Sequence, residues 1–219
     1  SHELRTPVAV MRTTAELARS QPRSAEDYEK ALDAILAESE RTTSLVEDLM
    51  LLARADAGAE QMAFEPLDAA ELLSAACAEV RVLAEAKGVR LTMGACESLK
   101  VSGDQQALRR LILILLDNAL KYTPRGGAVH ACVSGGGCVS GREAVIEVRD
   151  TGAGIGVEDL PHIFERFYRA AKDRSRTTGG TGLGLSIAQW ITANHGGEIL
   201  VESDQGAGST FRVRLPAIS

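Results

Sequence analysis

The sequence contains few cysteines and no long run of apolar residues. None of its four cysteines (Cys77, Cys96, Cys132, Cys138) belongs to a CxxC pair or has histidines at metal-binding spacing. We therefore expect free intracellular thiols rather than a zinc site. The longest purely aliphatic run, residues 111–116, is far shorter than the roughly 20 residues that a helix needs to cross a bilayer. No signal peptide is visible either.

The chain also lacks an excess of positive charge. Its formal net charge is −6, which argues against broad binding to nucleic acid or to anionic membranes. Any polyanionic ligand must therefore be held by local cations and not by the field of the whole protein. With 219 residues, of which 45% are hydrophobic and 25% charged, the chain is long enough for one large domain or two modest ones.

Two helices are predicted at the start of the chain, over residues 1–20 and about 26–57, with a turn-forming break at 21–24. Apolar and small residues recur on them at three- and four-residue steps, the pattern of helices that pack on near-parallel neighbours. Because one hairpin has too little core to stand alone, we expect it to dimerise into a four-helix bundle. The stripes consist of Leu4, Val8, Met11 and Ala15 on the first helix and Leu32, Ile35, Ser39, Thr42, Val46, Leu49 and Ala53 on the second.

The two predicted helices differ in length. At 1.5 Å per residue the first reaches roughly 30 Å and the second roughly 45 Å, so the second would overhang by about ten residues. The chain also begins inside a motif and has no initiator Met. We therefore expect an excised fragment whose first helix continues further towards the N-terminus, and the lack of a membrane span here says nothing about the parent protein.

The pattern changes after a short linker around Gly58, to helices mixed with short strands. Strands that cluster late in the chain, with helices on one face, indicate an α+β sandwich. We place the domain boundaries at 1–58 and 62–219, and expect the glycine-rich residues 134–137 to join two strands. The predicted helices span 67–87, 104–121 (with Asp104 as N-cap), 158–169 and about 183–195; the predicted strands span 89–94, 99–102, 128–134, 143–149, 198–203 and 209–215.

Three tracts in this second part point together to a nucleotide. Glycines alternate in residues 179–186 (GGTGLGLS), which lets backbone amides approach a phosphate, and the helix that follows has an N-terminus that favours an anion. Such a tract alone is weak support. Here it follows an asparagine-bearing helix end at 117–122 and an acidic, glycine-rich turn at 150–154. The order of the three tracts indicates a nucleotide-binding site.

A histidine near the start of the chain has an unusual setting. His2 and Thr6 are four residues apart and share a helix face, and Glu3 lies beside His2. Pro7 lacks an N–H and its ring displaces the carbonyl of Glu3, so the helix is loosened next to the histidine. A neutral imidazole is a competent nucleophile, and an adjacent carboxylate can accept or orient its second proton. A lone exposed histidine is usually only a surface residue, but this combination indicates a functional one.

Taken together, these tracts resemble the transmitter core of bacterial two-component sensor histidine kinases, over essentially the whole chain. The ATP-binding part also resembles the ATPase domains of gyrase and of some chaperones, which lack the histidine hairpin. Six family boxes occur in the family's order: the phosphoacceptor box at 2–7, the asparagine box at 116–124, the first glycine box at 150–155, the phenylalanine box at 163–169, the second glycine box at 180–184 and the third at 206–211.

The resemblance implies ATP and Mg²⁺ as cofactors and assigns roles to individual residues. Asn118 would coordinate Mg²⁺, and Asp150 would accept a hydrogen bond from the adenine amino group. Lys121 and Tyr122 would reach phosphate and adenine, and Arg169 the γ-phosphate. The full nucleotide-binding set is Asn118, Lys121, Tyr122, Asp150, Gly152, Gly154, Ile155, Arg169, Gly180, Thr181, Gly182, Leu183, Gly184, Leu185 and Thr210.

Two further features of the nucleotide site follow from the resemblance. Residues 170–181 look like a mobile lid over the triphosphate, with Phe164 and Phe167 packed beneath it. One position departs from the family pattern, because Ile114 stands where many members carry a second asparagine one turn before Asn118. Two alternatives follow: a weaker metal affinity, or a metal shell completed by a glutamate and water. In neither case do we expect the change to abolish activity, because Asn118, Asp150 and the glycines remain.

The implied reaction is autophosphorylation of His2 by Mg·ATP with help from Glu3, followed by transfer to an aspartate of a response-regulator receiver domain. Thr6 stands where the family orients water to dephosphorylate that regulator. The implied protein is a homodimer that binds no nucleic acid, and this chain is the cytoplasmic part of a parent anchored in the bacterial inner membrane. Two alternatives remain open: a non-catalytic pseudokinase that scaffolds a regulator, and a transmitter dominated by phosphatase activity.

Overall fold

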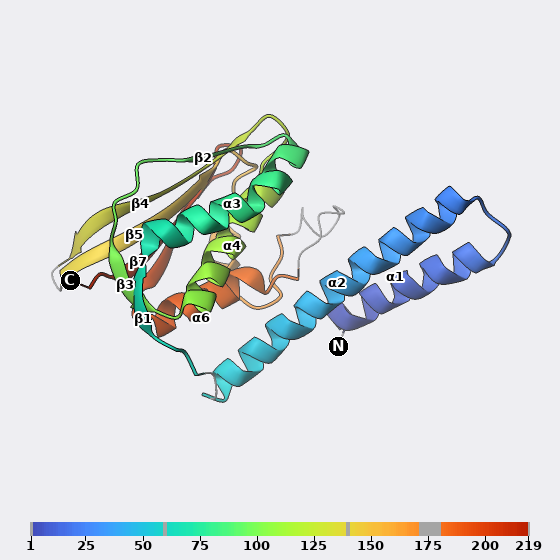
Figure 1. Ribbon diagram of the computed structural model, residues 1–219, viewed down its shortest axis with the longest axis horizontal. Helices are drawn as coiled ribbons and strands as arrows, with labels where there is room; N and C mark the ends of the chain where they lie inside the picture. Colours follow the sequence, from blue (N-terminus) through green and yellow to red (C-terminus); the bar gives the residue numbers. More distant parts are fainter. Residues whose placement is uncertain (1, 59–60, 139–140, 171–180, 219) are drawn as a thin grey trace. The chain divides into compact units, whose positions relative to one another are not determined.

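The computed structural model describes residues 2–58, 61–138, 141–170 and 181–218. The chain divides into two compact units, Ser1–Glu60 and Gln61–Ser219. The first is a helical hairpin and the second a mixed α/β domain, as the sequence predicted (Figure 1).

The first unit consists of α1 (His2–Arg19) and α2 (Ala25–Asp56), which lie side by side. Ser24 is the N-cap of α2, and its side-chain oxygen accepts a hydrogen bond from the Asp27 backbone N–H at 3.1 Å. Such a cap, immediately after the break at 21–24, explains why the second helix starts where it does. The predicted hairpin and its turn are confirmed.

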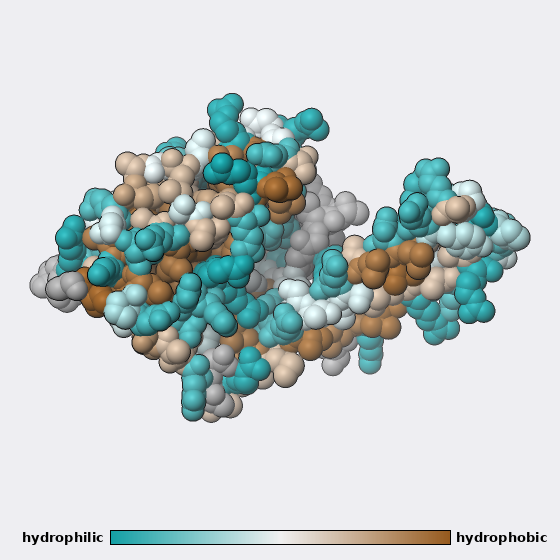
Figure 2. Space-filling view, viewed as in Figure 1, coloured by the Kyte–Doolittle hydropathy of each residue, from teal (hydrophilic) through white to brown (hydrophobic). Residues whose placement is uncertain are grey.

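The predicted stripe on α2 does not face α1 as a whole. Ile35, Thr42 and Leu49 are half-buried, whereas Leu32 and Val46 are 60% and 39% exposed. Apolar side chains accordingly gather on the visible surface of this hairpin, in brown in Figure 2. A single hairpin thus covers one half of the stripe and leaves the other half on its surface, as expected of half a helical bundle.

The second unit contains a five-stranded sheet in the order β2-β4-β5-β7-β6. Three helices, α3 (Ala69–Lys87), α4 (Gln105–Tyr122) and α6 (Gly184–Asn194), cover one of its faces (Figure 1). A short antiparallel pair, β1 (Glu65–Asp68) with β3 (Lys100–Gly103), stands apart from the sheet. The sheet strands are β2 (Arg90–Met93), β4 (Ala128–Cys138), β5 (Gly141–Asp150), β6 (Glu198–Asp204) and β7 (Gly208–Pro216).

The core lies between this sheet and its helices. Leu111 and Leu115 of α4 are fully buried, and they belong to the apolar run that the sequence left open between strand and helix. Asp104 caps α4 by accepting a hydrogen bond from the Ala107 N–H at 2.9 Å, which confirms the helix and its predicted start. Alternate residues of the strands, such as Ile146 and Val213, point into the same core.

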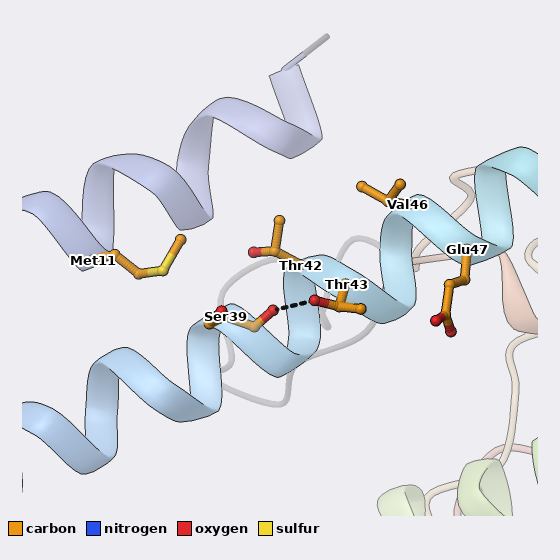
Figure 3. A pocket seen from close by; sticks show the side chains of 6 residues that line it. All are labelled: Met11, Ser39, Thr42, Thr43, Val46 and Glu47. Carbon is orange, nitrogen blue, oxygen red and sulfur yellow. Dashed lines mark hydrogen bonds between the residues drawn. The ribbon is translucent and has the colours of Figure 1, made fainter.

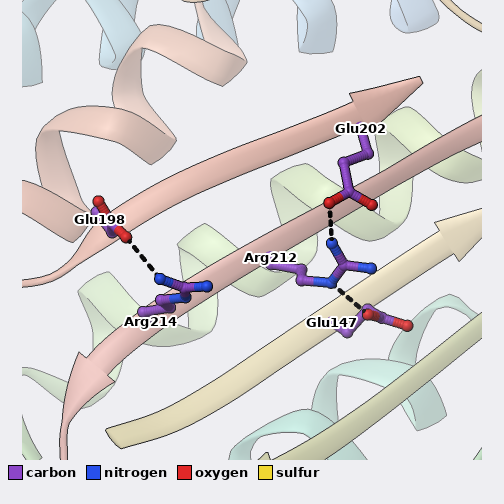
Figure 4. Close-up of polar contacts among 5 residues, drawn as sticks. All are labelled: Glu147, Glu198, Glu202, Arg212 and Arg214. Carbon is purple, nitrogen blue, oxygen red and sulfur yellow. Dashed lines mark hydrogen bonds and ion pairs between the residues drawn. The ribbon is translucent and has the colours of Figure 1, made fainter. Parts of the chain in front are cut away.

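The opposite, outer face of the sheet carries a row of ion pairs (Figure 4). Arg212 of β7 lies between Glu147 of β5 and Glu202 of β6, at 2.7 Å from each carboxylate. Arg214 pairs with Glu198 at 3.1 Å. These cross-strand pairs explain how charged residues alternate with core residues along β7.

Three local predictions were wrong. Residues 67–68 belong to β1, because Asp68 caps α3 through the Ala70 and Glu71 amides and the helix begins only at Ala69. Residues 158–169 form a short 3₁₀ turn, η1 (Leu160–His162), and further turns in place of a helix. Residues 134–137 lie within β4, which pairs with β5 as far as Cys138, so the strands turn later than their glycines suggested.

Among the described residues, no helix combines the length and apolar character that crossing a bilayer requires.

Candidate nucleotide site

The C-terminal half of α4 carries the asparagine tract. Asn118, Lys121 and Tyr122 are all half-buried there. The Lys121 ammonium nitrogen lies 4.7 Å from the centre of the Tyr122 ring, within the range of a cation–π contact. The end of the helix therefore presents an amide, a cation and an aromatic ring within little more than one turn.

The acidic turn that follows β5 packs on this helix end. The Ala153 N–H donates a hydrogen bond to the Tyr122 carbonyl oxygen at 3.3 Å. A Cβ atom at Gly152 would lie 2.6 Å from that same oxygen, a distance no side chain tolerates, so the close approach requires glycine. The structure thus brings together two predicted tracts that are separated by some thirty residues.

Asp150 is the buried acid of the site. It is only 5% exposed, and its Oδ1 accepts hydrogen bonds from the Gly152 N–H at 2.7 Å and the Ser209 N–H at 3.3 Å. Burial raises the pKa of Asp150 above its ordinary value, because a carboxylate loses solvation there, and the two amide hydrogen bonds oppose that rise. A buried carboxyl whose pKa is raised by burial is a candidate functional group.

The turn between β6 and β7 packs closely on the acidic turn, backbone against backbone. Gly154 has φ +65° and a Cβ there would lie 2.0 Å from the Asp204 carbonyl oxygen; a Cβ at Gly208 would lie 2.0 Å from the Asp150 carbonyl oxygen. The Gly206 N–H also donates to the Ala153 carbonyl oxygen at 2.7 Å. The first and third glycine tracts are therefore one packed unit in which the glycines permit backbone-to-backbone contact.

Within that unit, Thr210 and the preceding residue, Ser209, lie on opposite faces of the sheet. Ser209 is buried and bonded to Asp150, whereas Thr210 pairs with Arg149 and, by strand alternation, faces the outer side of the sheet. Thr210 helps to line a hollow of about 270 Å³ together with Arg149, Glu202 and Arg212, and Asp150, Ser203 and Ser209 line the same hollow. Sequence reasoning did not name Ser209 or Ser203, although the step of two from the core residue Phe211 would have placed Ser209 on the inner face.

The second glycine tract lies on the other side of α4. A Cβ at Gly184, the first residue of α6, would lie 3.3 Å from a methyl carbon of Ile114. Leu183, the N-cap of α6, has no capping side chain among the described residues, and the Thr181 Oγ1 accepts a hydrogen bond from the Leu183 N–H at 3.3 Å. Among the described residues, no side chain therefore caps the amides of the first turn of α6, the arrangement in which helix N-termini bind anions.

The phenylalanine tract meets the second glycine tract at Gly182. The Phe167 N–H donates to the Gly182 carbonyl oxygen at 2.9 Å, and a Cβ at Gly182 would come within 2.8 Å of the Phe167 backbone. Phe167 has φ +65°, a strained conformation for a bulky residue and one that clusters at functional sites. Phe167 is 45% exposed, and Arg169 nearby is half-buried.

Some predicted residues lie outside what the structure describes. Gly180 and nearly all of the predicted lid, residues 170–181, are outside the described residues, which include only its two ends. His2 and Glu3 form the first turn of α1 through their backbones, and Thr6 lies exposed one turn further on. Of the predicted nucleotide-binding set, the 118–122 and 150–155 tracts meet at the end of α4, and Gly184 of the 181–185 tract approaches Ile114 of the same helix; the binding role of every member of the set, Gly180 included, stays a prediction.

No group of three or more acidic, histidine or cysteine side chains at metal-binding spacing occurs among residues 2–58, 61–138, 141–170 and 181–218. A divalent cation in this domain would therefore depend on ligands other than such a protein cluster. Asn118 and the oxygens of a bound polyphosphate form the donor set that fits, because Mg²⁺ is usually held by few protein oxygens plus phosphate and water.

The hairpin has a groove of its own. About 260 Å³ lies between α1 and α2, bounded by Met11 on α1 and by Thr42, Val46 and Glu47 among others on α2 (Figure 3). The Thr43 hydroxyl donates to the Ser39 carbonyl oxygen at 3.0 Å, so this polar side chain is satisfied within its own helix. The groove belongs to the surface that the predicted bundle would cover.

Comparison with known proteins identifies both units. Residues 1–58 match the His Kinase A (phospho-acceptor) domain, and residues 103–219 match the family of histidine kinase-, DNA gyrase B- and HSP90-like ATPases. The sensor-like histidine kinase SenX3 of Mycobacterium tuberculosis is 38% identical over 219 residues, covering all of this chain and 52% of the relative. The sensor protein CutS of Streptomyces coelicolor is 37% identical over 217 residues, covering 99% of this chain and 51% of CutS.

Solved structures agree. The mycobacterial sensor histidine kinase MprB superposes with a TM-score of 0.61 and 28% identity, over 71% of this chain and 98% of that one. The Acinetobacter baumannii histidine kinase AdeS, at 20% identity, shares the fold over 100% of this chain and 99% of its own, with a TM-score of 0.75. This chain spans about half the length of the curated relatives it matches. It belongs to the two-component sensor histidine kinases, of which it is the transmitter core: a phospho-acceptor helical hairpin followed by a histidine kinase-type ATPase domain.

Proposed function

We propose that this chain binds Mg·ATP in its second unit and transfers the γ-phosphoryl group to His2. The observation that carries the proposal is the assembly around α4, on which pack both the turn with the buried Asp150 carboxyl and the N-terminus of α6, for which no side-chain cap occurs among the described residues. The same chain supplies a phospho-acceptor hairpin. The full-length ShkA structure, 28% identical and matched over 100% of this chain and 44% of its own, is a complex with AMPPNP, an ATP analogue, which supports a nucleotide as the ligand.

The donors and acceptors of the site fit ATP. Asp150 offers a buried acceptor suited to the adenine amino group, and Tyr122 an aromatic ring near the end of α4. The Lys121 ammonium, which lies over the Tyr122 ring, and the first amides of α6 suit phosphate oxygens. Because the chain as a whole carries a net charge of −6, these local groups have to supply the attraction for a polyanion.

We further propose that Asn118 holds Mg²⁺ through its side-chain oxygen. The metal would neutralise charge on the phosphate oxygens during transfer. Ile114 lies one turn earlier, and its side chain approaches Gly184. Because that side chain is a hydrocarbon, it offers no oxygen to the metal. The single amide ligand is consistent with a cation held mainly by phosphate and water.

The histidine chemistry is that of in-line phosphoryl transfer. A neutral His2 imidazole nitrogen attacks the γ-phosphorus, an N–P bond forms, and the O–P bond to the β-phosphate breaks to release ADP. Glu3 accepts or orients the proton on the second ring nitrogen. Positioning and charge neutralisation supply most of the rate enhancement in such reactions, and Arg169 is the proposed partner for charge on the γ-phosphate.

The partners follow from the family. Sensor histidine kinases pair with response regulators and dimerise through the phospho-acceptor hairpin, and the exposed apolar residues of α1 and α2 suit that interface. We propose that the phosphohistidine passes its group to an aspartate of a receiver domain. We also propose that the parent protein is anchored in the inner membrane, with this chain in the cytoplasm.

The proposal predicts a particular product. The full chain incubated with γ-labelled ATP and Mg²⁺ should become labelled on histidine, and chelation of the metal should reduce that labelling to background. Phosphohistidine is acid-labile and base-stable, so the label should be lost in acid and retained in alkali. A label that survives acid would place the phosphate on serine or threonine, and nucleotide binding without any label would favour the scaffold alternative.

Thr6 is proposed to orient water for dephosphorylation of the regulator. It lies on α1 one turn after His2. Replacing Thr6 with Ala should lower the rate at which the chain dephosphorylates its regulator by about 10- to 100-fold and leave labelling of His2 largely intact. Thr13→Ala, an exposed position further along the same helix, is the control. Equal loss of both activities in the Thr6 variant would mean a structural role instead.

A further inference from the structure

Ser203 contacts the acidic turn from the neighbouring strand β6. It lies on β6 opposite Ser209 in the ladder with β7. Its Oγ accepts a hydrogen bond from the Ile155 N–H at 2.8 Å, donates one to the Gly208 carbonyl oxygen at 2.9 Å, and lies 2.9 Å from the Ser209 Oγ. One side chain thus connects the turn after β5 with the turn between β6 and β7.

Two of these contacts bear on the direction of the third, the hydrogen bond between the Ser203 and Ser209 hydroxyls. A serine hydroxyl has one proton and two acceptor positions. The Ser203 proton is directed at the Gly208 carbonyl oxygen, which can only accept, and the Ile155 amide occupies one acceptor position. With the Ser203 proton on that carbonyl oxygen, we assign Ser209 as the donor in the contact between the two hydroxyls. The Ser209 hydroxyl is left with lone pairs alone for any other partner.

The consequence lies at Asp150. The Ser209 N–H donates to the Asp150 Oδ1 at 3.3 Å. Asp150 and Ser209 lie next to the paired residues Arg149 and Thr210 on the antiparallel strands β5 and β7, so their side chains both lie on the inner face of the sheet. Asp150, when ionised, also only accepts hydrogen bonds. The Ser209 hydroxyl and the Asp150 carboxylate can therefore both accept a hydrogen bond from a ligand, and neither side chain has a proton left to donate to one.

We propose that Ser203 is a positioning residue that holds Ser209 as a hydrogen-bond acceptor beside Asp150. The site then selects a purine that carries a donor at position 6. An adenine amino group is such a donor, whereas guanine and hypoxanthine carry an acceptor oxygen there. This inference rests on the proposed nucleotide site and adds to it a determinant of base selectivity that touches no nucleotide itself.

The test compares ATP with inosine triphosphate, which has a carbonyl oxygen at position 6. The dissociation constant of each is measured on the full chain with Mg²⁺, and the ratio of the inosine triphosphate value to the ATP value is the readout. In Ser203→Ala, the Ser209 hydroxyl can rotate and donate to that carbonyl, so the ratio should fall by about tenfold. Ser203→Thr keeps a hydroxyl at this position and should retain the wild-type ratio.

Two further variants separate positioning from general damage. Ser209→Ala should lower the ratio as well, and the double variant should lower it no further than either single one, because Ser203 acts through Ser209. Ser209→Ala also tests the inference if Ser203→Ala does not fold. Glu202→Gln, on the same strand but on the outer face, is the control and should keep the ratio.

The possible results distinguish a failure of the selectivity role of Ser203 from a failure of the proposed ATP binding on which that role rests. Weaker binding of both nucleotides at an unchanged ratio in Ser203→Ala and Ser209→Ala would overturn the role in selectivity, since a purely structural defect affects both ligands alike. Additive effects in the double variant would also overturn it. A wild-type chain that binds neither nucleotide would instead overturn the proposed function.

Discussion

Replacement of His2 by Gln is expected to abolish labelling by γ-labelled ATP. Glutamine has a similar size and keeps a polar side chain, but its amide nitrogen is not nucleophilic, so no N–P bond can form. The nucleotide site lies in the other unit of the chain. The dissociation constant for ATP should therefore stay within about twofold of the wild-type value, because the substitution changes no residue of the unit that contains Asn118 and Asp150.

The matched control is His130→Gln. His130 lies on β4, where its ring nitrogen is 3.2 Å from the Thr92 hydroxyl, and the mechanism assigns it no task. Labelling of this variant should equal that of the wild type. Persistent labelling of His2→Gln would show that another residue accepts the phosphate, and loss of ATP binding in that variant would show that the substitution acts on the fold.

Replacement of Asp150 by Asn is expected to separate stability from function. The variant should bind ATP about 10- to 100-fold more weakly, because a charge-assisted hydrogen bond to the adenine amino group is lost. Without nucleotide, its unfolding should require more urea than the wild type at neutral pH, because a buried charge with only two amide hydrogen bonds is removed. Isothermal titration and urea unfolding of the full chain measure the two effects.

The stability gain has a defined pH dependence. Burial raises the pKa of Asp150 in the folded state above the ordinary 3.8, so the unfolded chain releases this proton more readily. The penalty of the buried charge is complete above the folded-state pKa and shrinks as the pH falls through that value. The stability difference between variant and wild type should therefore be largest at neutral pH and vanish below about pH 3.8.

Asp204→Asn is the control for this prediction. Asp204 is an exposed carboxylate at the end of β6, next to the same turn. Its replacement should change neither the urea midpoint at neutral pH nor ATP affinity by a comparable amount. If Asp150→Asn destabilises the nucleotide-free chain at neutral pH, the raised pKa is not the dominant property of this carboxyl.

Much of the helical structure could be predicted from local signals. Asp104 lies just before a long apolar run and indeed caps α4, and Ser24 caps α2 in the same way. Strands with clear alternation, such as residues 143–149, were found within β5. These elements depend on hydrogen bonds and side-chain periods that act within a few residues, which is why the order of amino acids reveals them.

The wrong predictions share a cause. Residues 67–68 form a strand because β3 pairs with them, and residues 134–137 continue β4 because β5 runs alongside. Both strands are decided by a partner distant in the chain. Phe167 adopts φ +65° against Gly182, a conformation that local preference disfavours and that the tertiary contact imposes. A window of sequence contains none of these partners.

By itself, the sequence determined which chemical groups this protein has and in what order: a histidine hairpin, then an asparagine helix, an acidic turn and glycine tracts. The tertiary structure decided which of these groups meet. It placed Ser209, and not Thr210, beside Asp150, and it put Ser203 behind both. The physical reason is that hydrogen bonds and burial at this site join β5, β6 and β7, and only the folded sheet brings those strands into register.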